Sequence, residues 1–253
     1  GRVSMFDISK AAMDRIDALN PHINALVTKT YDYGVRQMAK NPTGPLAGVP
    51  YMLKDLNSLA GVRTTRGSRL FTSHTSSRQS PYTDNILSSG VIILGKTNTP
   101  EFGLMPTTEP VANGATRNPW NLGYSCGGSS GGAAASVASR MIAAAQASDG
   151  GGSIRFPAAA CHLFGLKPSR GRFGDQGYEN QLVSLSIKHA ISRTVRDSAF
   201  MLALTENGPG ATLSPVGYVE GPTNKKRKFA LSMNAGNVSP DYDTRRSVQK
   251  VAQ

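Results

Sequence analysis

The sequence predicts an α/β fold with a mixed or parallel sheet. Stretches with helical periodicity alternate along the chain with short apolar runs, and this order of elements is typical of the class. The chain has 253 residues, 39% of them hydrophobic, which is enough to bury a sizeable core. No apolar run reaches the ~18–20 residues that a membrane-spanning helix needs. We therefore expect a globular chain without a membrane span.

The first part of the chain predicts two helices and two strands. Residues 7–20 place apolar side chains on one helical face, and Asn20-Pro21 is expected to end that helix. A short strand is predicted at 23–28 and a second helix at 31–38. The run LAGVPYMLKD at 46–55 predicts an apolar strand that carries Lys54 near its end.

The middle of the chain predicts one helix and one deeply buried strand. A helix is expected at 80–90, followed by the continuous apolar strand VIILG at 91–95. Loops are expected at 96–103 and 115–126. Trp120, the only tryptophan, is interpreted as a packing anchor rather than a substrate platform.

The remaining elements begin with a small-residue segment at 133–147, which is rich in alanine and predicts a helix that ends at 141–145. After it the sequence predicts a sharp turn at 148–153, a strand at 161–166, a loop at 187–195, a helix at 196–207, a strand at 228–232 and a helix at 241–253.

The net charge of +12 raises the question of nucleic-acid binding. Most Lys and Arg residues are scattered, however, and the tight cluster Lys225–Lys228 is interpreted as a solvated loop, so a nucleic-acid partner is not expected. Cys126 and Cys161 form no CxxC motif, and we expect neither a disulfide nor a metal site from them. The expected compartment is reducing and cytoplasmic.

The common motifs for metals, cofactors and nucleophilic serines are missing from the sequence. No histidine has metal-ligand spacing to a second His or Cys, and there is no GxSxG elbow, Walker A pattern or Rossmann spacing. We therefore expect no metal and no cofactor. His162 follows Ser153 by nine residues and is interpreted as a core histidine rather than a catalytic base.

The most informative stretch spans residues 123–172, where two Gly/Ser clusters flank the alanine-rich segment. A serine hydroxyl needs a base, and a neutral lysine can serve when burial lowers its pKa. Lys54 follows an apolar run that would bury it; the alternative is a lysine that extends to the surface. The glycines at 150–152 allow backbone N–H groups to converge on an oxyanion, and Asp149 and Arg155 would pin this turn as an ion pair.

At these residues the sequence resembles the amidase signature family. The glycine and serine motif of the family is present at 127–132 (GGSSGG) and its nucleophile segment at 149–158 (DGGGSIRFPA). Its lysine segment is present at 48–55. Further matches are GKTN at 95–98, EF at 101–102, NP at 118–119, GLKP at 165–168 and SRTVRD at 192–197.

The resemblance implies an amidase signature fold, in which a mixed central β-sheet is flanked by helices on both faces. It also implies a Ser–cis-Ser–Lys triad, with Ser153 as nucleophile, Ser129 as the bridging cis-serine and Lys54 as base. The oxyanion hole would use the backbone N–H groups of Gly150, Gly151, Gly152 and Ser153. Ser130, Asp149 and Arg155 would support the site. Ser148 stands where the family commonly has threonine, which also carries a hydroxyl.

The family domain is about twice as long as this chain. We therefore expect residues 1–253 to be the N-terminal half of one amidase signature domain that is truncated at its C-terminal side. The substrate wall within the chain would include Met105 and the loop at 174–184.

The resemblance implies an amidase that hydrolyses a linear C–N amide bond to a carboxylate and an amine or ammonia through an acyl-Ser153 intermediate. Phe156 and the GATRNPW segment at 114–120 are closest to bacterial amidases of aryl-acylamides, fatty amides or 6-aminohexanoate oligomers. The expected partner is a small-molecule amide, and a homodimer stays open. Two alternatives remain: a glutamyl-tRNA amidotransferase A-type subunit, which typically has glutamine in place of Phe156, and a non-catalytic fragment.

Overall fold

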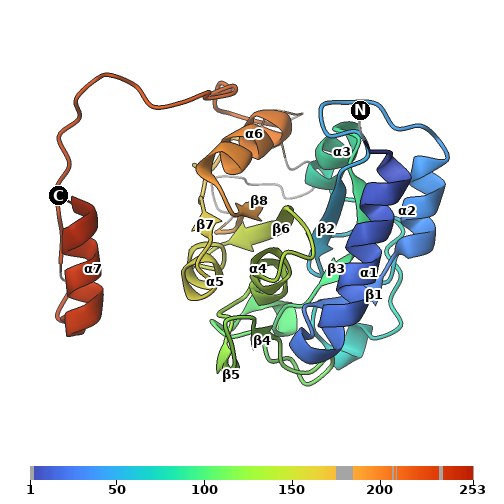
Figure 1. Cartoon of the computed structure of the whole chain (residues 1–253), viewed down its shortest axis with the longest axis horizontal. Coiled ribbons are helices and arrows are strands. Elements are labelled where there is room, and N and C mark those ends of the chain that lie inside the picture. Colours follow the sequence, from blue (N-terminus) through green and yellow to red (C-terminus); the bar gives the residue numbers. More distant parts are fainter. Residues whose placement is uncertain (1–2, 175–184, 207, 209, 234–235, 253) are drawn as a thin grey trace. The chain divides into compact units, whose positions relative to one another are not determined.

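The structure is a computed structural model that describes the chain except residues 1–2, 175–184, 207, 209, 234–235 and 253. The described residues form two compact units, 1–220 and 221–253. In chain order (Figure 1) the elements are α1 Met5–Ile23, β1 Leu26–Lys29, α2 Tyr31–Met38, β2 Pro50–Lys54, the 3₁₀ turn η1 Arg69–Phe71, α3 Pro81–Ser88, β3 Ile92–Thr97, the 3₁₀ turn η2 Glu101–Gly103, β4 Arg117–Asn118, β5 Asn121–Ser125, α4 Gly131–Ala138, β6 Ala144–Asp149, α5 Arg155–Ala160, β7 Phe164–Gly165, β8 Ile187–Ser192, α6 Val195–Thr205 and α7 Tyr242–Ala252.

The strands of the first unit form two three-stranded sheets and a hairpin. The first sheet has the order β1-β3-β2, in which β2 runs parallel and β1 antiparallel to β3. The second has the order β6-β8-β7 and is antiparallel. Strands β2 and β6 lie side by side, and there the side chain of Gln146 accepts a hydrogen bond from the backbone N–H of Lys54 at 2.9 Å. At this point a side-chain amide, rather than a backbone carbonyl, accepts the hydrogen bond that links the two sheets.

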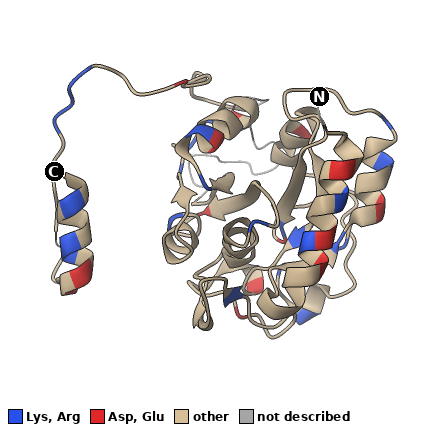
Figure 2. Cartoon of the chain, in the orientation of Figure 1, with Lys and Arg blue, Asp and Glu red and all other residues tan. Residues whose placement is uncertain are grey.

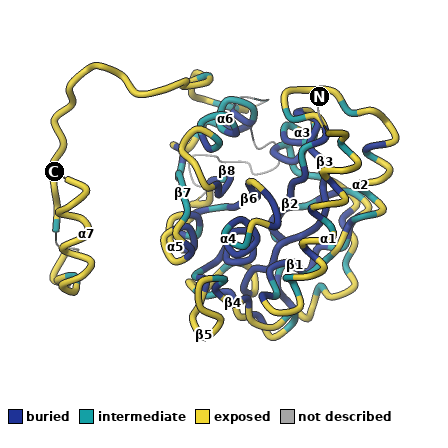
Figure 3. Tube along the Cα trace, viewed as in Figure 1, coloured by how far each residue is buried: buried dark blue, intermediate teal, exposed yellow. Residues whose placement is uncertain are grey.

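Successive side chains of β3 belong in turn to two hydrophobic clusters, one on each face of the first sheet. Helices pack against both faces. Ile92 and Leu94 of β3 belong to a cluster that includes α1 and α4, whereas Ile93 belongs to one that includes α3 and α6. This alternation follows from the two-residue period of a strand. Strands β2 and β3 are buried throughout (Figure 3), as their apolar sequences predict. None of the described helices is long and apolar enough to cross a membrane.

Helix α1 is longer than the sequence predicts. It begins after Ser4, whose Oγ accepts a hydrogen bond from Asp7 N at 3.1 Å, and it continues through Pro21 to Ile23. The proline removes one N–H donor, but the last turn keeps the bond from Asn24 N to Asn20 O at 2.7 Å. The predicted end at Asn20 is therefore wrong by one turn.

The alanine-rich segment is not one helix, so the helix predicted at 133–147 is wrong. Helix α4 ends at Ala138, Arg140 takes a left-handed φ of 59°, and β6 begins at Ala144. Alanine fits a helix or a strand when small side chains are needed on both faces, and Ala145 and Ala147 are fully buried in β6. Tertiary packing, rather than helix propensity, decides the state of this half of the segment.

Residues predicted as a loop at 187–195 contain β8, the central strand of the second sheet. Lys188 and His189 interrupt the apolar pattern and hide this strand in the sequence. His189 is fully buried, its Nε2 lies 2.8 Å from Ser198 Oγ, and burial lowers its pKa to about 4. A neutral imidazole with a hydroxyl partner is compatible with the interior of the sheet.

Four smaller predictions also differ from the structure. The expected loop at 115–126 contains the β4–β5 hairpin, and the strand expected at 161–166 is confined to Phe164–Gly165. Trp120 is 67% exposed, although its Nε1 donates to Cys161 O at 2.8 Å, so it is not a buried anchor. His162 is exposed as well, with its ring edge-on to Trp120, and is not a core histidine.

The second unit, taken by itself, contains helix α7 and extended chain. The strand predicted at 228–232 is not formed, and Phe229 is 90% exposed. A lone strand needs a partner for its backbone groups, and the described residues of this unit offer none. Lys225–Lys228 are exposed, as a solvated loop requires.

Candidate active site

The first component of the site is Lys54, the last residue of β2. Its side chain is fully buried, and Nζ donates hydrogen bonds to Ser129 Oγ at 2.7 Å and to Ser148 Oγ at 3.1 Å. The apolar residues that precede it in β2 are all buried, and they carry the lysine into the interior. The structure therefore brings together two of the three predicted triad residues, Lys54 and Ser129.

Burial changes the acid–base behaviour of this lysine. Loss of solvent lowers the pKa of Lys54 from 10.5 to about 7, and the negative charge of Asp149 opposes this change. A neutral amine has two N–H groups and one lone pair. Lys54 can then donate to Ser148 while it accepts a proton from Ser129. This arrangement fits a general base that works near neutral pH.

Ser129 and Ser130 lie at the entrance to α4 and have different partners. The peptide bond between Gly128 and Ser129 is cis, which is the geometry that the resemblance implies for the bridging serine. Ser130 contacts the main chain of Ser148 through its Oγ, which donates to the carbonyl and accepts from the N–H, each at 3.3 Å. Ser129 thus faces Lys54, while Ser130 fastens the same loop to β6.

The turn after β6 is built around Asp149. Its carboxylate accepts two hydrogen bonds from Arg155, from Nε and Nη2, each at 2.9 Å, and others from the backbone N–H groups of Gly152, Ile154 and Arg155. Burial raises the pKa of Asp149, but the guanidinium and the three N–H groups outweigh it and lower this pKa to about 2. The ion pair expected between Asp149 and Arg155 is present.

Ser153 lies in this turn, just before α5, and is half-buried. Among the described residues its side chain has no hydrogen-bond partner, so the structure does not join Ser153 to Ser129 as it joins Ser129 to Lys54. Catalytic hydrogen bonds often tighten only when substrate is bound. The role of Ser153 as nucleophile therefore stays a prediction from the resemblance to the family.

One of the predicted oxyanion donors is already engaged. The N–H of Gly152 donates to Asp149 Oδ1 at 2.8 Å, and a backbone N–H has one proton to give. The N–H groups of Gly150, Gly151 and Ser153 have no acceptor among the described residues. An oxyanion hole in this turn would use those three groups, with Gly152 supporting the turn instead.

The sequence missed several residues that hold the site together. Ser148 binds Lys54, and Gln146 binds its backbone, and these two polar side chains stand two residues apart in an alanine-rich segment. That alternation is a strand signal, but the many alanines of the segment favour a helix on propensity alone. Behind the site, the fully buried Lys96 contacts Asp55 at 3.2 Å, and Asp55 also binds the backbone and hydroxyl of Thr65.

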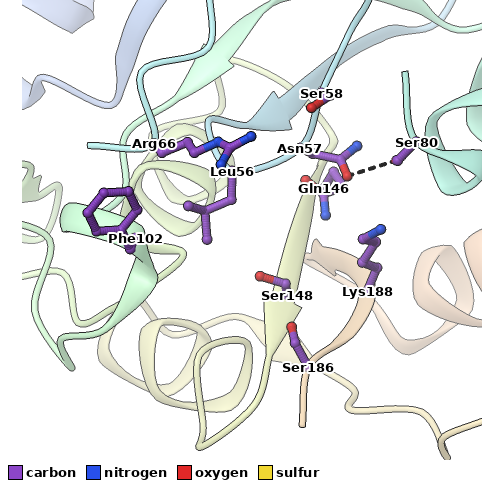
Figure 4. A pocket seen from close by; sticks show the side chains of 10 residues that line it. All are labelled: Leu56, Asn57, Ser58, Arg66, Ser80, Phe102, Gln146, Ser148, Ser186 and Lys188. Atoms are coloured by element: carbon purple, nitrogen blue, oxygen red, sulfur yellow. Dashed lines mark hydrogen bonds between the residues drawn. The ribbon is translucent and has the colours of Figure 1, made fainter. Parts of the chain in front are cut away.

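A pocket of about 380 Å³ opens beside Lys54 and is lined by ten residues, among them Leu56, Arg66, Phe102 and Ser148 (Figure 4). Ser148 contributes the hydroxyl that binds Lys54, so the pocket adjoins the lysine directly. Met105, predicted as part of the substrate wall, is 57% exposed and is not among the ten. The other predicted wall segment, 174–184, lies outside the described residues apart from Gly174.

Charged side chains elsewhere do not indicate a second kind of site. Within the described residues, no group of three or more His, Cys, Asp or Glu side chains is placed to hold a metal ion. Lys and Arg residues are spread over several elements (Figure 2). Cys126 and Cys161 are both free and buried.

Comparison with known proteins agrees with these motifs. The amidase family model matches residues 7–253. The chain is 38% identical over 219 residues to the 6-aminohexanoate-cyclic-dimer hydrolase of Paenarthrobacter ureafaciens, which covers 84% of this chain and 44% of that protein. It is 39% identical over 204 residues to the acylamidase of Rhodococcus erythropolis, with 78% and 43% covered.

A solved structure of 6-aminohexanoate cyclic dimer hydrolase complexed with substrate superimposes with a TM-score of 0.80 at 35% identity, covering 89% of this chain and 47% of that one. The chain thus spans about half the length of the curated relatives that it matches. On the family match, the relatives and the shared fold, the chain belongs to the amidase signature family.

Proposed function

We propose that this chain carries the catalytic residues of an amidase that hydrolyses a linear amide to a carboxylate and an amine or ammonia. The observation that carries the proposal is the contact of 2.7 Å between Lys54 Nζ and Ser129 Oγ in a fully buried environment. A buried lysine whose pKa is lowered to about 7 and whose amine meets a serine hydroxyl is suited to proton transfer. The family membership of the chain supports the same reaction.

The proposed chemistry uses Ser153 as nucleophile and Ser129 as relay. Neutral Lys54 accepts the proton of Ser129 while Ser129 accepts that of Ser153, whose Oγ forms a bond to the amide carbon. The N–H groups of Gly150, Gly151 and Ser153 would stabilise the oxyanion. The C–N bond then breaks as the relay returns the proton to the leaving nitrogen. Water attacks the acyl-serine ester by the same relay, which releases the carboxylate and regenerates Ser153.

The test is covalent labelling by a fluorophosphonate, which reacts with an activated serine. We expect the unaltered chain to be labelled and Ser153→Ala to lose the label. Ser88→Ala is a matched control, because Ser88 is exposed and its hydroxyl donates to Asn85 O within α3, at 2.8 Å. Equal labelling of Ser153→Ala and the unaltered chain, or no labelling of either, would refute the proposed nucleophile.

A further inference from the structure

The pocket beside Lys54 adjoins Ser129, the proposed relay serine. Leu56 forms part of its wall, and a methyl group placed on Gly103 would lie 2.6 Å from Leu56 Cδ1 and 3.3 Å from Ser129 Oγ. On another side, Ser148 lines the pocket and binds Lys54. Its volume of about 380 Å³ falls within the range of small-ligand sites. A substrate whose amide is attacked by Ser153, with Ser129 as the relay, would therefore have this pocket for part of its chain.

The side chains that line the pocket carry an excess of positive charge. None of the ten described residues that line it is acidic, whereas two of them, Arg66 and Lys188, are cationic. Figure 4 shows Arg66 beside Leu56, with Phe102 next to them and Ser148 across the pocket. The pocket therefore combines a positive group with an apolar wall formed by Leu56 and Phe102.

Arg66 is held rigidly at its backbone. It takes a left-handed φ of 55°, and its N–H donates to Asp55 O at 3.2 Å while its carbonyl accepts from Phe102 N at 2.8 Å. The guanidinium lies over the ring of Phe71, 5.0 Å from the ring centroid. Stacking on one face leaves the N–H groups at the edge of the guanidinium available to a ligand.

Within the part of the chain that the structure describes, the guanidinium of Arg66 has no anionic partner. The side chain is half-buried, and among the described residues it makes no hydrogen bond and no ion pair. A partly desolvated guanidinium gains most from a carboxylate, which its planar fork can bind through two parallel hydrogen bonds. The adjoining apolar side chains would contact methylene groups between that carboxylate and the scissile amide.

We propose that Arg66 determines substrate specificity by binding a carboxylate that the substrate carries, so that the favoured amides have an aliphatic chain ending in a carboxylate. This proposal rests on the proposed amidase function, because it places the amide at Ser129 and Ser153. It names Arg66 as a binding residue and gives it no part in the proton transfer.

The experiment measures binding separately from catalysis, on protein carrying Ser153→Ala. Isothermal titration calorimetry compares adipic acid monoanilide with its neutral carboxamide analogue, which has the same shape. We expect the acid to bind more tightly than the carboxamide. We expect Arg66→Met to raise the Kd of the acid about 10- to 100-fold, as the loss of a charged hydrogen-bond pair does, and to change that of the carboxamide less than twofold.

Two further variants sharpen the comparison. Arg66→Lys keeps the charge but loses the planar fork, and we expect an intermediate Kd for the acid. Arg69→Met removes an exposed arginine of η1 and should change neither Kd. Thermal unfolding of each variant checks that the fold is retained. Three outcomes would overturn the proposal: the protein that retains Arg66 binds acid and carboxamide equally, it binds neither, or Arg66→Met weakens the binding of both equally.

Fluorophosphonate labelling of protein with Ser153 intact separates this proposal from the proposed function. Carboxylate binding that depends on Arg66, without labelling of Ser153, would refute the amidase function and leave the anion site in place. Labelling of Ser153 together with equal binding of acid and carboxamide would refute only the role of Arg66.

Discussion

The titration of Lys54 is the sharpest prediction that the structure offers. Burial lowers its pKa from 10.5 to about 7, which corresponds to about 5 kcal/mol at 1.36 kcal/mol for each pKa unit. An ordinary lysine is neutral in about one molecule in 3000 at pH 7, whereas about half of the Lys54 side chains would be neutral. We therefore expect the rate of a reaction that needs neutral Lys54 to rise with pH and to level off above about pH 7.

The assay is the rate constant for fluorophosphonate labelling of Ser153 between pH 5 and 9, because this single step excludes product release. We expect about a tenfold increase for each pH unit below the midpoint and a plateau above it. His189 cannot supply this midpoint, because burial lowers its pKa to about 4. A rate that is flat over the whole range, or the same midpoint in Lys54→Met, would refute the assignment of Lys54 as base.

The same pKa predicts how stability changes with pH. Between about pH 7 and 10 the unfolded chain holds a proton on Lys54 that the folded chain has released. The unfolded state therefore binds more protons, and the free energy of unfolding rises with pH by up to about 1.4 kcal/mol per unit from this residue. Lys54→Met should remove that slope, which urea unfolding at a series of pH values would measure. An unchanged slope would contradict the lowered pKa.

Three further predictions concern the surroundings of this lysine. Ser129→Ala should lower the labelling rate of Ser153 at least 100-fold without changing the melting temperature by more than a few degrees; a smaller loss would exclude Ser129 as relay. Gly103→Ala should also lower this rate, because Gly103 has a φ of 72° and its new methyl group would lie 3.3 Å from Ser129 Oγ; an unchanged rate would show that the loop can move aside. Asp55→Asn should cost about 3–5 kcal/mol of unfolding free energy, because the buried charge of Lys96 then keeps the hydroxyl of Thr64 but loses its carboxylate partner. Lys10→Ala breaks an exposed helical pair and should cost under about 1 kcal/mol, so similar losses of the two variants in urea unfolding would contradict the prediction.

The sequence by itself predicted the α/β class and the deeply buried strands. The apolar runs before Lys54 and at 91–95 leave few alternatives to a strand, and both are buried in the structure. The glycine and serine motifs also predicted the proposed chemistry, because they supply hydroxyls and permissive backbone positions and resemble motifs of the amidase signature family. Local pattern was sufficient where one conformation is favoured strongly over the others.

Tertiary structure decided the elements for which the local preference is weak. Residues 144–149 carry alanines that suit a helix, yet they form β6 because β8 and β2 lie on either side. Strand β8 contains a lysine and a histidine, and only its position between β6 and β7 explains why it is a strand. In these segments, packing against distant parts of the chain outweighs propensities of a few tenths of a kcal/mol per residue.

In the candidate active site, too, the sequence predicts some residues, whereas only the tertiary structure shows their partners. The sequence identified Lys54, Ser129 and the turn at 149–155, but partners of these groups come from residues distant in the chain. Ser148 and Gln146 reach Lys54 only because β6 packs beside β2, and this contact joins residues 92 and 94 positions apart. Likewise, the engagement of Gly152 by Asp149 depends on how the turn closes. Sequence motifs therefore determined which groups are present, and the three-dimensional packing determined their protonation, their partners and the pocket that opens beside them.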